Sequence, residues 1–117
     1  MADALDRVRA GEEDPACLEC GGILKSATIS FGQSLVAEDL ERAERESAGS
    51  DLYLAIGTSL TVYPVAWLPE RALQNGARLV IVNAEPTPLD DRAHAVLRGQ
   101  IGEILPALVE QVAALPA

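Results

Sequence analysis

The sequence predicts an α/β fold in which helices cover a parallel sheet. Aliphatic residues have to form the core, because 49% of the 117 residues are hydrophobic and only 3% are aromatic. Two near-continuous apolar runs of strand length, 51–56 and 78–82, are typical of strands buried on both faces. Helical spacing recurs between these runs and after them, and the chain length suits one compact domain.

The segments ahead of the first run are shorter and more polar. Residues 1–16 are charged and interrupted by Gly and Pro, with a helical turn near Leu5–Val8. Thr28–Phe31 alternates enough to form a short strand that ends at Gly32. A helix follows and stops at Gly49. The inward face of this helix consists of Val36, Leu40, Ala43 and Ser47.

The remaining elements alternate between strands and helices. Asp51–Ile56 is the first buried strand, and Pro69 fits the first turn of a helix that ends before Gly76. Arg78–Val82 and the short run Ala95–Leu97 are two more strands, and a final helix follows them. The apolar stripe of that helix consists of Ile101, Leu105, Leu108, Val112 and Leu115. This order is half of a doubly wound, Rossmann-like sheet, and it leaves a sheet edge exposed.

Charge and hydropathy narrow the function classes. The formal net charge of −9 repels phosphate backbones and anionic lipid, so we expect no nucleic-acid or membrane binding. It favours a basic partner such as a lysine-bearing peptide, unless the acids only keep the protein soluble. No apolar run approaches a membrane span, and the N-terminus lacks the apolar core of a signal peptide. We therefore expect a cytoplasmic protein whose two cysteines stay reduced.

Polar loops follow two of the predicted strands. Gly57, Thr58 and Ser59 come directly after the first, where glycine lets a ligand approach the backbone and hydroxyls meet phosphate or ribose oxygens. Asn83 and Glu85 follow the second, and such a pair suits a ribose diol. Ordinary connecting turns use the same residue types. Because parallel strands end at one sheet edge, the two loops together favour a shared nucleotide site.

Cys17 and Cys20, with Gly21 and Gly22 behind them, form a Cys-x-x-Cys-Gly-Gly motif. Such glycines let backbone N–H groups turn toward thiolates, as in a zinc knuckle. A structural zinc ion needs four ligands and the chain has no other cysteine, so the motif is half a site. Redox use and two plain reduced thiols are the alternatives. The expected fold thus carries a truncated zinc-knuckle module at its N-terminus.

His94 is the one histidine of the sequence, just ahead of the last predicted strand. A general base is one interpretation of it, and an incidental surface side chain is the more common one. We predict no catalytic residue in this chain.

Taken together and in order, five motifs resemble the C-terminal portion of a sirtuin, an NAD-dependent protein-lysine deacylase. The motifs are C-x-x-C-G-G-x-L-K from Cys17, I-S-F-G-Q-x-L from Ile29, I-G-T-S-L-x-V-x-P from Ile56, V-I-V-N-x-E from Val80 and G-x-I-G-E-I-L-P from Gly99. One such motif alone is weak, whereas five in the same order are specific. The resemblance extends from about Arg7 to Val112.

The resemblance implies a divided NAD site. The loop after the first long strand would bind the phosphates and the nicotinamide ribose, the Asn-x-Glu loop would bind the adenine ribose, and the start of the last helix would lie beside the adenine. The implied NAD-binding residues are Gly57, Thr58, Ser59, Asn83, Glu85, Gln100 and Ile101.

The resemblance also implies a cleft in which an acyl-lysine peptide pairs as an extra strand. The implied peptide-binding residues are Ile29, Phe31, Gly32, Gln33 and Val62. The family usually has Glu where Gln33 stands, which removes one acidic contact to a basic peptide. Residues 1–35 then represent a remnant of the zinc-binding module and the substrate-cleft strand. Residues 36–117 represent the C-terminal half of an NAD-binding, Rossmann-like domain.

Sirtuins carry further parts in their N-terminal half, and this sequence lacks them. These are a glycine-rich turn for the pyrophosphate, an Asn-Asp pair near the nicotinamide, a catalytic histidine and a first Cys-x-x-Cys pair. His94 does not occupy the place of the catalytic histidine. We therefore expect a truncated chain that is inactive alone. The alternatives are a half that complements a separate N-terminal sirtuin piece, and a module that binds adenine nucleotides or ADP-ribose.

Overall fold

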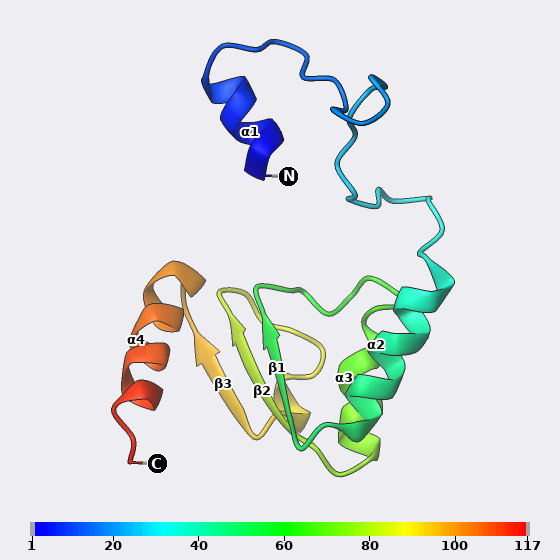
Figure 1. Cartoon of the computed structure of the whole chain (residues 1–117). Coiled ribbons are helices and arrows are strands. Elements are labelled where there is room, and N and C mark those ends of the chain that lie inside the picture. Colours follow the sequence, from blue (N-terminus) through cyan, green and yellow to red (C-terminus); the bar gives the residue numbers. More distant parts are fainter. Residues whose placement is uncertain (1, 117) are drawn as a thin grey trace. The chain divides into compact units, whose positions relative to one another are not determined.

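The computed structural model describes residues 2–116, which form two compact units that divide between Leu35 and Val36. Each unit has its own local structure and is considered by itself. The second unit contains every strand of the chain's sheet, together with the longer helices (Figure 1).

A parallel sheet with the strand order β1-β2-β3 forms the centre of the second unit (Figure 1). The strands are β1 (Leu52–Ile56), β2 (Arg78–Asn83) and β3 (Ala95–Arg98). The register pairs Ile56 with Val82, and Val82 with Leu97, so all three carboxyl ends meet at one edge. The predicted α/β class and its parallel sheet are confirmed, and the strand bounds agree within one residue.

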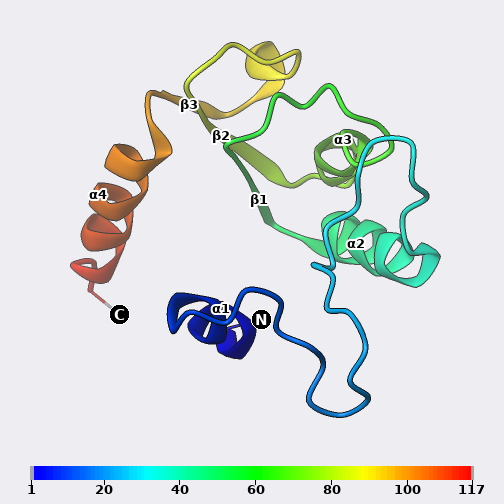
Figure 2. The same cartoon turned by 90° about the horizontal axis from the view of Figure 1, so that it is seen from above.

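Helices α2 (Ala37–Gly49) and α3 (Trp67–Gln74) pack side by side on one face of the sheet (Figure 2). The alternation of each strand directs small and branched side chains to that face. The core consists of Ala55, Leu60, Leu79, Ile81 and Leu89. Helix α3 has Pro69 in its first turn and is followed by Gly76 at φ +88°, both as predicted.

The predicted inward face of α2 is confirmed in its second half. Ser47 is buried and donates a hydrogen bond from its hydroxyl to the carbonyl of Ala43, 2.7 Å away. Val36 does not belong to that face, because it precedes the helix and its side chain is 52% exposed. Helical spacing sets which side chains share a face, whereas the entry of the chain into the helix decides where that face begins.

Helix α4 (Ile101–Ala113) lies on the other side of the sheet from α2 and α3 (Figure 2). Its half-buried side chains are Ile104, Leu105 and Leu108. The predicted stripe is wrong at its far end, since Val112 is 59% exposed and Leu115 lies beyond the helix. None of the helices within residues 2–116 has both the length and the apolar character that crossing a membrane requires.

Strand β1 is an edge of the sheet, and the face of β1 directed away from α2 and α3 is largely uncovered. Leu52 is 53% exposed and Leu54 is 45% exposed, while the alternating residue Ala55 is buried. The backbone of β1 pairs with β2 on one side and has no strand partner on the other within the described residues. The uncovered edge predicted from the sequence is therefore present.

The first unit begins with helix α1 (Ala2–Arg9), which is longer than the predicted turn. The Arg7 guanidinium pairs with the Glu12 carboxylate at 2.7 Å and donates to the carbonyl of Ala16 at 2.9 Å. A single antiparallel bridge joins Ala16 to Ile23 and closes the loop that contains both cysteines.

The strand predicted at Thr28–Phe31 is wrong. The segment is irregular and leads into a turn in which the Gln33 amide donates to the Ser30 carbonyl at 3.1 Å. An alternating pattern forms a strand only where a neighbouring strand accepts its backbone hydrogen bonds, and the described residues provide none for this segment.

Candidate functional site

Three loops of the second unit emerge at the carboxyl edge of the sheet. Gly57 follows β1, and its amide donates to the carbonyl of Val82 at 2.8 Å. Asn83 ends β2 and lies in register with Arg98, the last residue of β3. The predicted placement of Gly57 and Asn83 at one edge is thus confirmed. In parallel sheets this edge is where ligands bind.

Gly57 brings the first of these loops against the start of α4. Its φ of +63° is a left-handed conformation that favours glycine. A Cβ atom at this position would lie only 3.2 Å from Cδ1 of Ile101. The structure therefore places two of the residues with implied NAD roles, one from the phosphate side and one from the adenine side, in direct proximity.

The loop after Gly57 holds a conformation that sequence reasoning missed. Leu60 is buried and has φ +55°, which is uncommon for a residue with a side chain. The Thr58 hydroxyl accepts a hydrogen bond from the Leu60 amide at 3.3 Å, and the Ser59 and Thr61 hydroxyls lie 2.7 Å apart. The buried leucine anchors the loop and leaves Ser59 exposed at the sheet edge.

Asn83 and Glu85 begin the loop after β2. The Asn83 amide nitrogen donates to the carbonyl of Glu85 at 2.9 Å, so the side chain of Asn83 folds over its own loop. The Glu85 side chain is exposed. This arrangement leaves the Asn83 amide oxygen and the Glu85 carboxylate as acceptors for hydroxyl groups.

Residues that the sequence analysis did not single out order this same loop. The Arg98 guanidinium contacts the carbonyls of Asn83 and Glu85 and pairs with the Asp90 carboxylate at 2.5 Å. Asp90 lies in η1 (Asp90–Arg92), a short 3-10 helix that was also not predicted. The available signal was the position of Arg98, opposite Asn83 in a parallel pair of strands.

Hydrogen bonds within the loop hold the pKa of Asp90 below its ordinary value. The Thr87 hydroxyl donates to the carboxylate at 2.7 Å and is the largest cause, and the Thr87 amide donates to it at 3.1 Å. The Arg98 guanidinium lowers the pKa further. Each donor favours the ionised carboxylate over the neutral acid.

His94 lies at the other end of the strands from Gly57 and Asn83. It precedes β3, and its backbone amide donates to the carbonyl of Leu79 at 2.8 Å. Its Nδ1 accepts a hydrogen bond from the Leu79 amide at 3.1 Å. The side chain therefore completes the backbone pairing at the amino ends of β2 and β3, away from Gly57 and Asn83.

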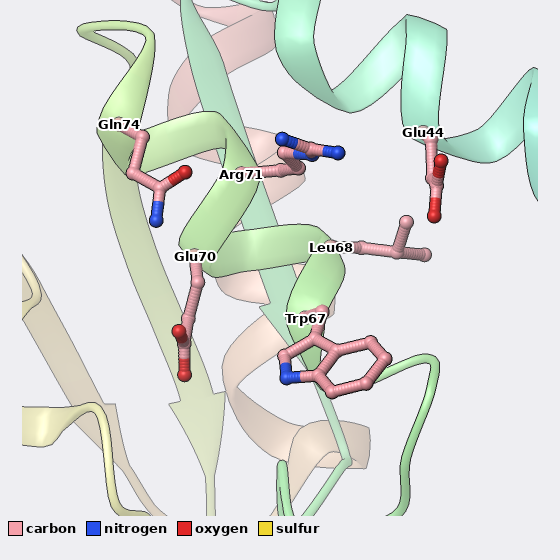
Figure 3. Close-up of a pocket in the computed structure, with 6 residues that line it drawn as sticks. All are labelled: Glu44, Trp67, Leu68, Glu70, Arg71 and Gln74. Carbon is pink, nitrogen blue, oxygen red and sulfur yellow. The ribbon is translucent and has the colours of Figure 1, made fainter.

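The second unit contains a cavity beside the first loop and another between its helices. One of about 370 Å³ lies beside β1 and is lined by Thr58 and Val62 as well as apolar residues of β1 and α3. The other, of about 260 Å³, lies between α2 and α3 (Figure 3). Its lining residues are Glu44, Trp67, Leu68, Glu70, Arg71 and Gln74, and none of them belongs to the predicted sites.

The implied peptide-binding residues fall in both units. In the first, Phe31 is 90% exposed, Ile29 is partly exposed, and Gly32 has φ +82° in the turn between them and Gln33. The Gln33 side-chain oxygen accepts a hydrogen bond from the Ser30 amide at 2.9 Å, which occupies it within its own turn. Val62 lies in the second unit, in the loop after Leu60.

Cys17 and Cys20 lie in a tight loop in which the Gly21 amide donates to the Cys17 carbonyl at 2.8 Å. The backbone amides of Cys20 and then Glu19 lower the pKa of the Cys17 thiol. This geometry suits one pair of thiolate ligands for a metal ion. Within residues 2–116 no group of three or more His, Cys, Asp or Glu side chains is arranged to hold a metal ion, and the half zinc site at Cys17 and Cys20 stays a prediction.

Comparison with known proteins identifies similar sequences. Residues 2–64 match the sequence profile of the Sir2 family. The chain is 52% identical over 109 residues to NAD-dependent protein deacetylase 2 of Streptomyces coelicolor, which covers 93% of this chain and 45% of that protein. It is 40% identical over 114 residues to an NAD-dependent protein deacetylase of Caldivirga maquilingensis, covering 97% of this chain and 44% of that one. The chain thus spans less than half the length of these relatives.

Solved structures show the same similarity. One, described as the structural basis for the mechanism and regulation of Sir2 enzymes, is 37% identical with a TM-score of 0.73, over 97% of this chain and 47% of that one. Another, a Sir2 complex with a p53 peptide and NAD+, is 29% identical with a TM-score of 0.71, over 97% of this chain and 47% of that one.

Proposed function

Because this chain belongs to the Sir2 family, we propose that its second unit supplies one side of the NAD site of a protein-lysine deacylase. The observation that carries the proposal is the meeting of three loops at the carboxyl edge of the sheet, with Gly57 against Ile101 and Asn83 beside them. The family resemblance read from the five motifs is confirmed. The role of each residue is part of the proposal.

The Asn-x-Glu loop binds the adenine ribose. The amide oxygen of Asn83 and the carboxylate of Glu85 accept hydrogen bonds from the two ribose hydroxyls. The hydrogen bond from a hydroxyl to a carboxylate is charge-assisted and is therefore the stronger of the two. The adenine lies along the backbone of Gln100 and Ile101, at the first turn of α4.

The Gly57 loop binds the phosphates and the nicotinamide ribose. The backbone of Gly57 has no side chain to shield it, and Thr58 and Ser59 add hydroxyl groups. None of the residues in this loop carries a positive charge, so the phosphates are only partly neutralised here. Bound NAD would supply the group that accepts the acyl oxygen in the sirtuin deacylase reaction.

The chain by itself does not complete this reaction. Its one histidine, His94, lies at the opposite sheet edge and is held by the Leu79 backbone. A general base has to reach the hydroxyl that it deprotonates, within about 3 Å. Binding without turnover is therefore the activity that we propose for this chain by itself.

The first unit contributes to the peptide side and to metal binding. Ile29, Phe31, Gly32 and Gln33 contact an acyl-lysine peptide, and Val62 is a further peptide contact. Cys17 and Cys20 supply two of the four zinc ligands. The exposure of Phe31 supports the first assignment, and the amides directed at the Cys17 sulfur support the second.

Titration with ADP-ribose, followed by backbone amide NMR shifts, tests the nucleotide site. Several charge-assisted phosphate contacts are absent and each contributes about 1.5–3 kcal/mol, so we expect a dissociation constant in the millimolar range. Shifts should concentrate at Gly57, Asn83 and Ile101. Glu85→Gln should weaken binding about tenfold. The control Gln74→Glu, on exposed α3 surface, should leave it unchanged. Shifts confined to the first unit would contradict the proposal.

We further propose that the free edge of β1 pairs with a second polypeptide segment, which completes the sheet and covers the exposed face of β1. The free edge of β1 and the exposed Leu52, Leu54 and Ile56 support this role. An exposed apolar strand at a sheet edge is an aggregation hazard unless another element covers it. The complementing segment that we propose has the character of the sirtuin N-terminal half.

Co-expression with the unmatched portion of the Streptomyces coelicolor relative tests this second role. NAD-dependent removal of acetyl groups from a lysine peptide should appear only when both pieces are present. Leu54→Glu should abolish association, because it places a charge on the docking face. The matched control Gln74→Glu should associate as the unaltered chain does. Association that survives Leu54→Glu, with normal circular dichroism, would exclude this face.

A further inference from the structure

The loop from Asn83 to Asp90 is closed by one side chain, that of Arg98. Its Nη1 donates to the carbonyl of Asn83 at 3.3 Å and also to the carbonyl of Glu85. Its Nη2 donates to the Asp90 carboxylate at 2.5 Å. One guanidinium therefore joins both ends of the loop to the end of β3.

The carbonyl of Glu85 is the point where two of these contacts converge. It accepts from Arg98 and, at 2.9 Å, from the side-chain amide of Asn83. This carbonyl therefore links the Arg98 guanidinium to the side chain of Asn83. The orientation of Asn83, and the direction in which Glu85 leaves the loop, thus depend on a residue from the neighbouring strand.

The far end of the loop is fixed in the same way. The Asp90 carboxylate accepts from the Thr87 hydroxyl and the Thr87 amide in addition to Arg98. The Thr87 hydroxyl also accepts from the Leu89 amide at 3.3 Å. Leu89 is 4% exposed and belongs to the core, so this network ties the loop to the packed interior.

We propose that Arg98 is a positioning residue, which sets Asn83 and Glu85 in the geometry that binds a ribose diol. The inference rests on the proposed nucleotide site. In this role Arg98 acts on the loop and not on the phosphates, because both of its terminal nitrogens donate hydrogen bonds to loop residues. Its planar fork reaches two carbonyls and a carboxylate together, which a single ammonium group does not reproduce.

Amide hydrogen exchange measured by NMR tests the clamp without any ligand. In Arg98→Met the amides of Thr87 and Leu89 should exchange about tenfold faster, because local opening becomes easier, while amides of β1 keep their rates. Arg92→Met is the matched control, since it removes the same charge from η1, where the described structure gives Arg92 no side-chain hydrogen bond. Asp90→Asn is a second variant that weakens the clamp without altering Arg98.

Titration of the same variants with ADP-ribose tests the consequence for binding. We expect the dissociation constant to rise about tenfold in Arg98→Met and at least about threefold in Arg98→Lys, which keeps the charge but loses the fork. If Arg98→Lys kept wild-type affinity while Arg98→Met bound weakly, simple charge attraction rather than positioning would explain the role of Arg98. Unchanged exchange in Arg98→Met would overturn the clamp. Absence of binding by the unaltered chain would instead contradict the proposed nucleotide site, and the exchange rates would still decide the clamp.

Discussion

Single residues at the carboxyl edge of the sheet carry most of the functional argument. Gly57 combines a left-handed backbone with a close approach to Ile101, and the two features together favour glycine. Leu60 adopts a left-handed conformation with a full side chain, and its burial in the core compensates for the strain. The backbone conformations of Gly57 and Leu60 therefore set the shape of this edge.

Gly57→Ala should destabilise the chain by about 1–2 kcal/mol, because an L side chain in the left-handed region is strained and its Cβ crowds Ile101. Urea unfolding followed by the fluorescence of Trp67, the one tryptophan, measures the change. Gly102→Ala is the control, since a Cβ there meets nothing within 4 Å and lies in α4. It should stabilise by about 0.5–1 kcal/mol. Equal effects of the two substitutions would contradict the account.

The lowered pKa of Asp90 predicts that the loop from Asn83 to Asp90 loses stability in acid. Its pKa in the folded chain is lowered, so its stabilising contribution is complete above the unfolded pKa, near 4, and is lost as pH falls through the lower folded value. Unfolding midpoints measured between neutral pH and about pH 3 should fall less steeply for Asp90→Asn than for the unaltered chain. Asp91→Asn, one residue along, is the control. An Asp90→Asn profile parallel to that of the unaltered chain would show that the carboxylate is not coupled to folding.

Individual elements differ in how far they are supported by packing. Helix α3 buries Leu68, Pro69 and Ala72 against its neighbours. Helix α4 has no buried residue and packs through the half-buried side chains of Ile104, Leu105 and Leu108. The two helices thus differ in how much of their surface other elements cover.

Substitutions along α4 should show this difference. Leu108→Ala removes half-buried apolar surface and should cost about 1–2 kcal/mol, below the 2–5 kcal/mol typical of a fully buried leucine. Val112→Ala, at a side chain that is 59% exposed, should stay within about 0.5 kcal/mol. Urea unfolding with a circular dichroism readout at 222 nm, a wavelength characteristic of helices, compares them. A larger loss for Val112→Ala would mean that another surface covers the end of α4.

At the scale of the molecule, the chain consists of two units of unequal character. The second has a sheet, a core and helices on both faces. The described part of the first unit has one helix and one backbone bridge, and no residue of α1 is buried. A unit with so small an interior needs further stabilisation, for example by a bound metal ion or a partner surface.

The zinc content of the purified protein tests whether a bound zinc ion stabilises the first unit. Two thiolates leave two positions of the zinc tetrahedron to water, so the dialysed protein should retain well under one zinc ion per chain. Elemental analysis by mass spectrometry measures the ratio, with Cys17→Ser as the control for specific uptake. Retention of one zinc ion per chain would contradict the half-site. One zinc ion per two chains would point to a site shared by Cys17 and Cys20 of both copies.

Sequence reasoning recovered the elements whose pattern is local. The three strands, the ends of α2 and α3 and the shared edge of Gly57 and Asn83 follow from apolar runs, glycine positions and the geometry of parallel sheets. Five ordered motifs were sufficient for the family, which comparison with known proteins confirmed. The individual roles of the site residues remain predictions.

The tertiary structure decided the features that depend on what lies opposite a residue. Thr28–Phe31 has the alternation of a strand but finds no partner strand in residues 2–116, and nothing in those residues covers Val112, at the far end of the apolar stripe of α4. The clamp of Arg98 on Asn83, Glu85 and Asp90 joins two strands that are fifteen residues apart at their paired ends. A sequence pattern specifies which groups share a face, because that follows from helical and strand periods. Which groups meet across elements is set by packing, and it becomes visible only once the sheet is assembled.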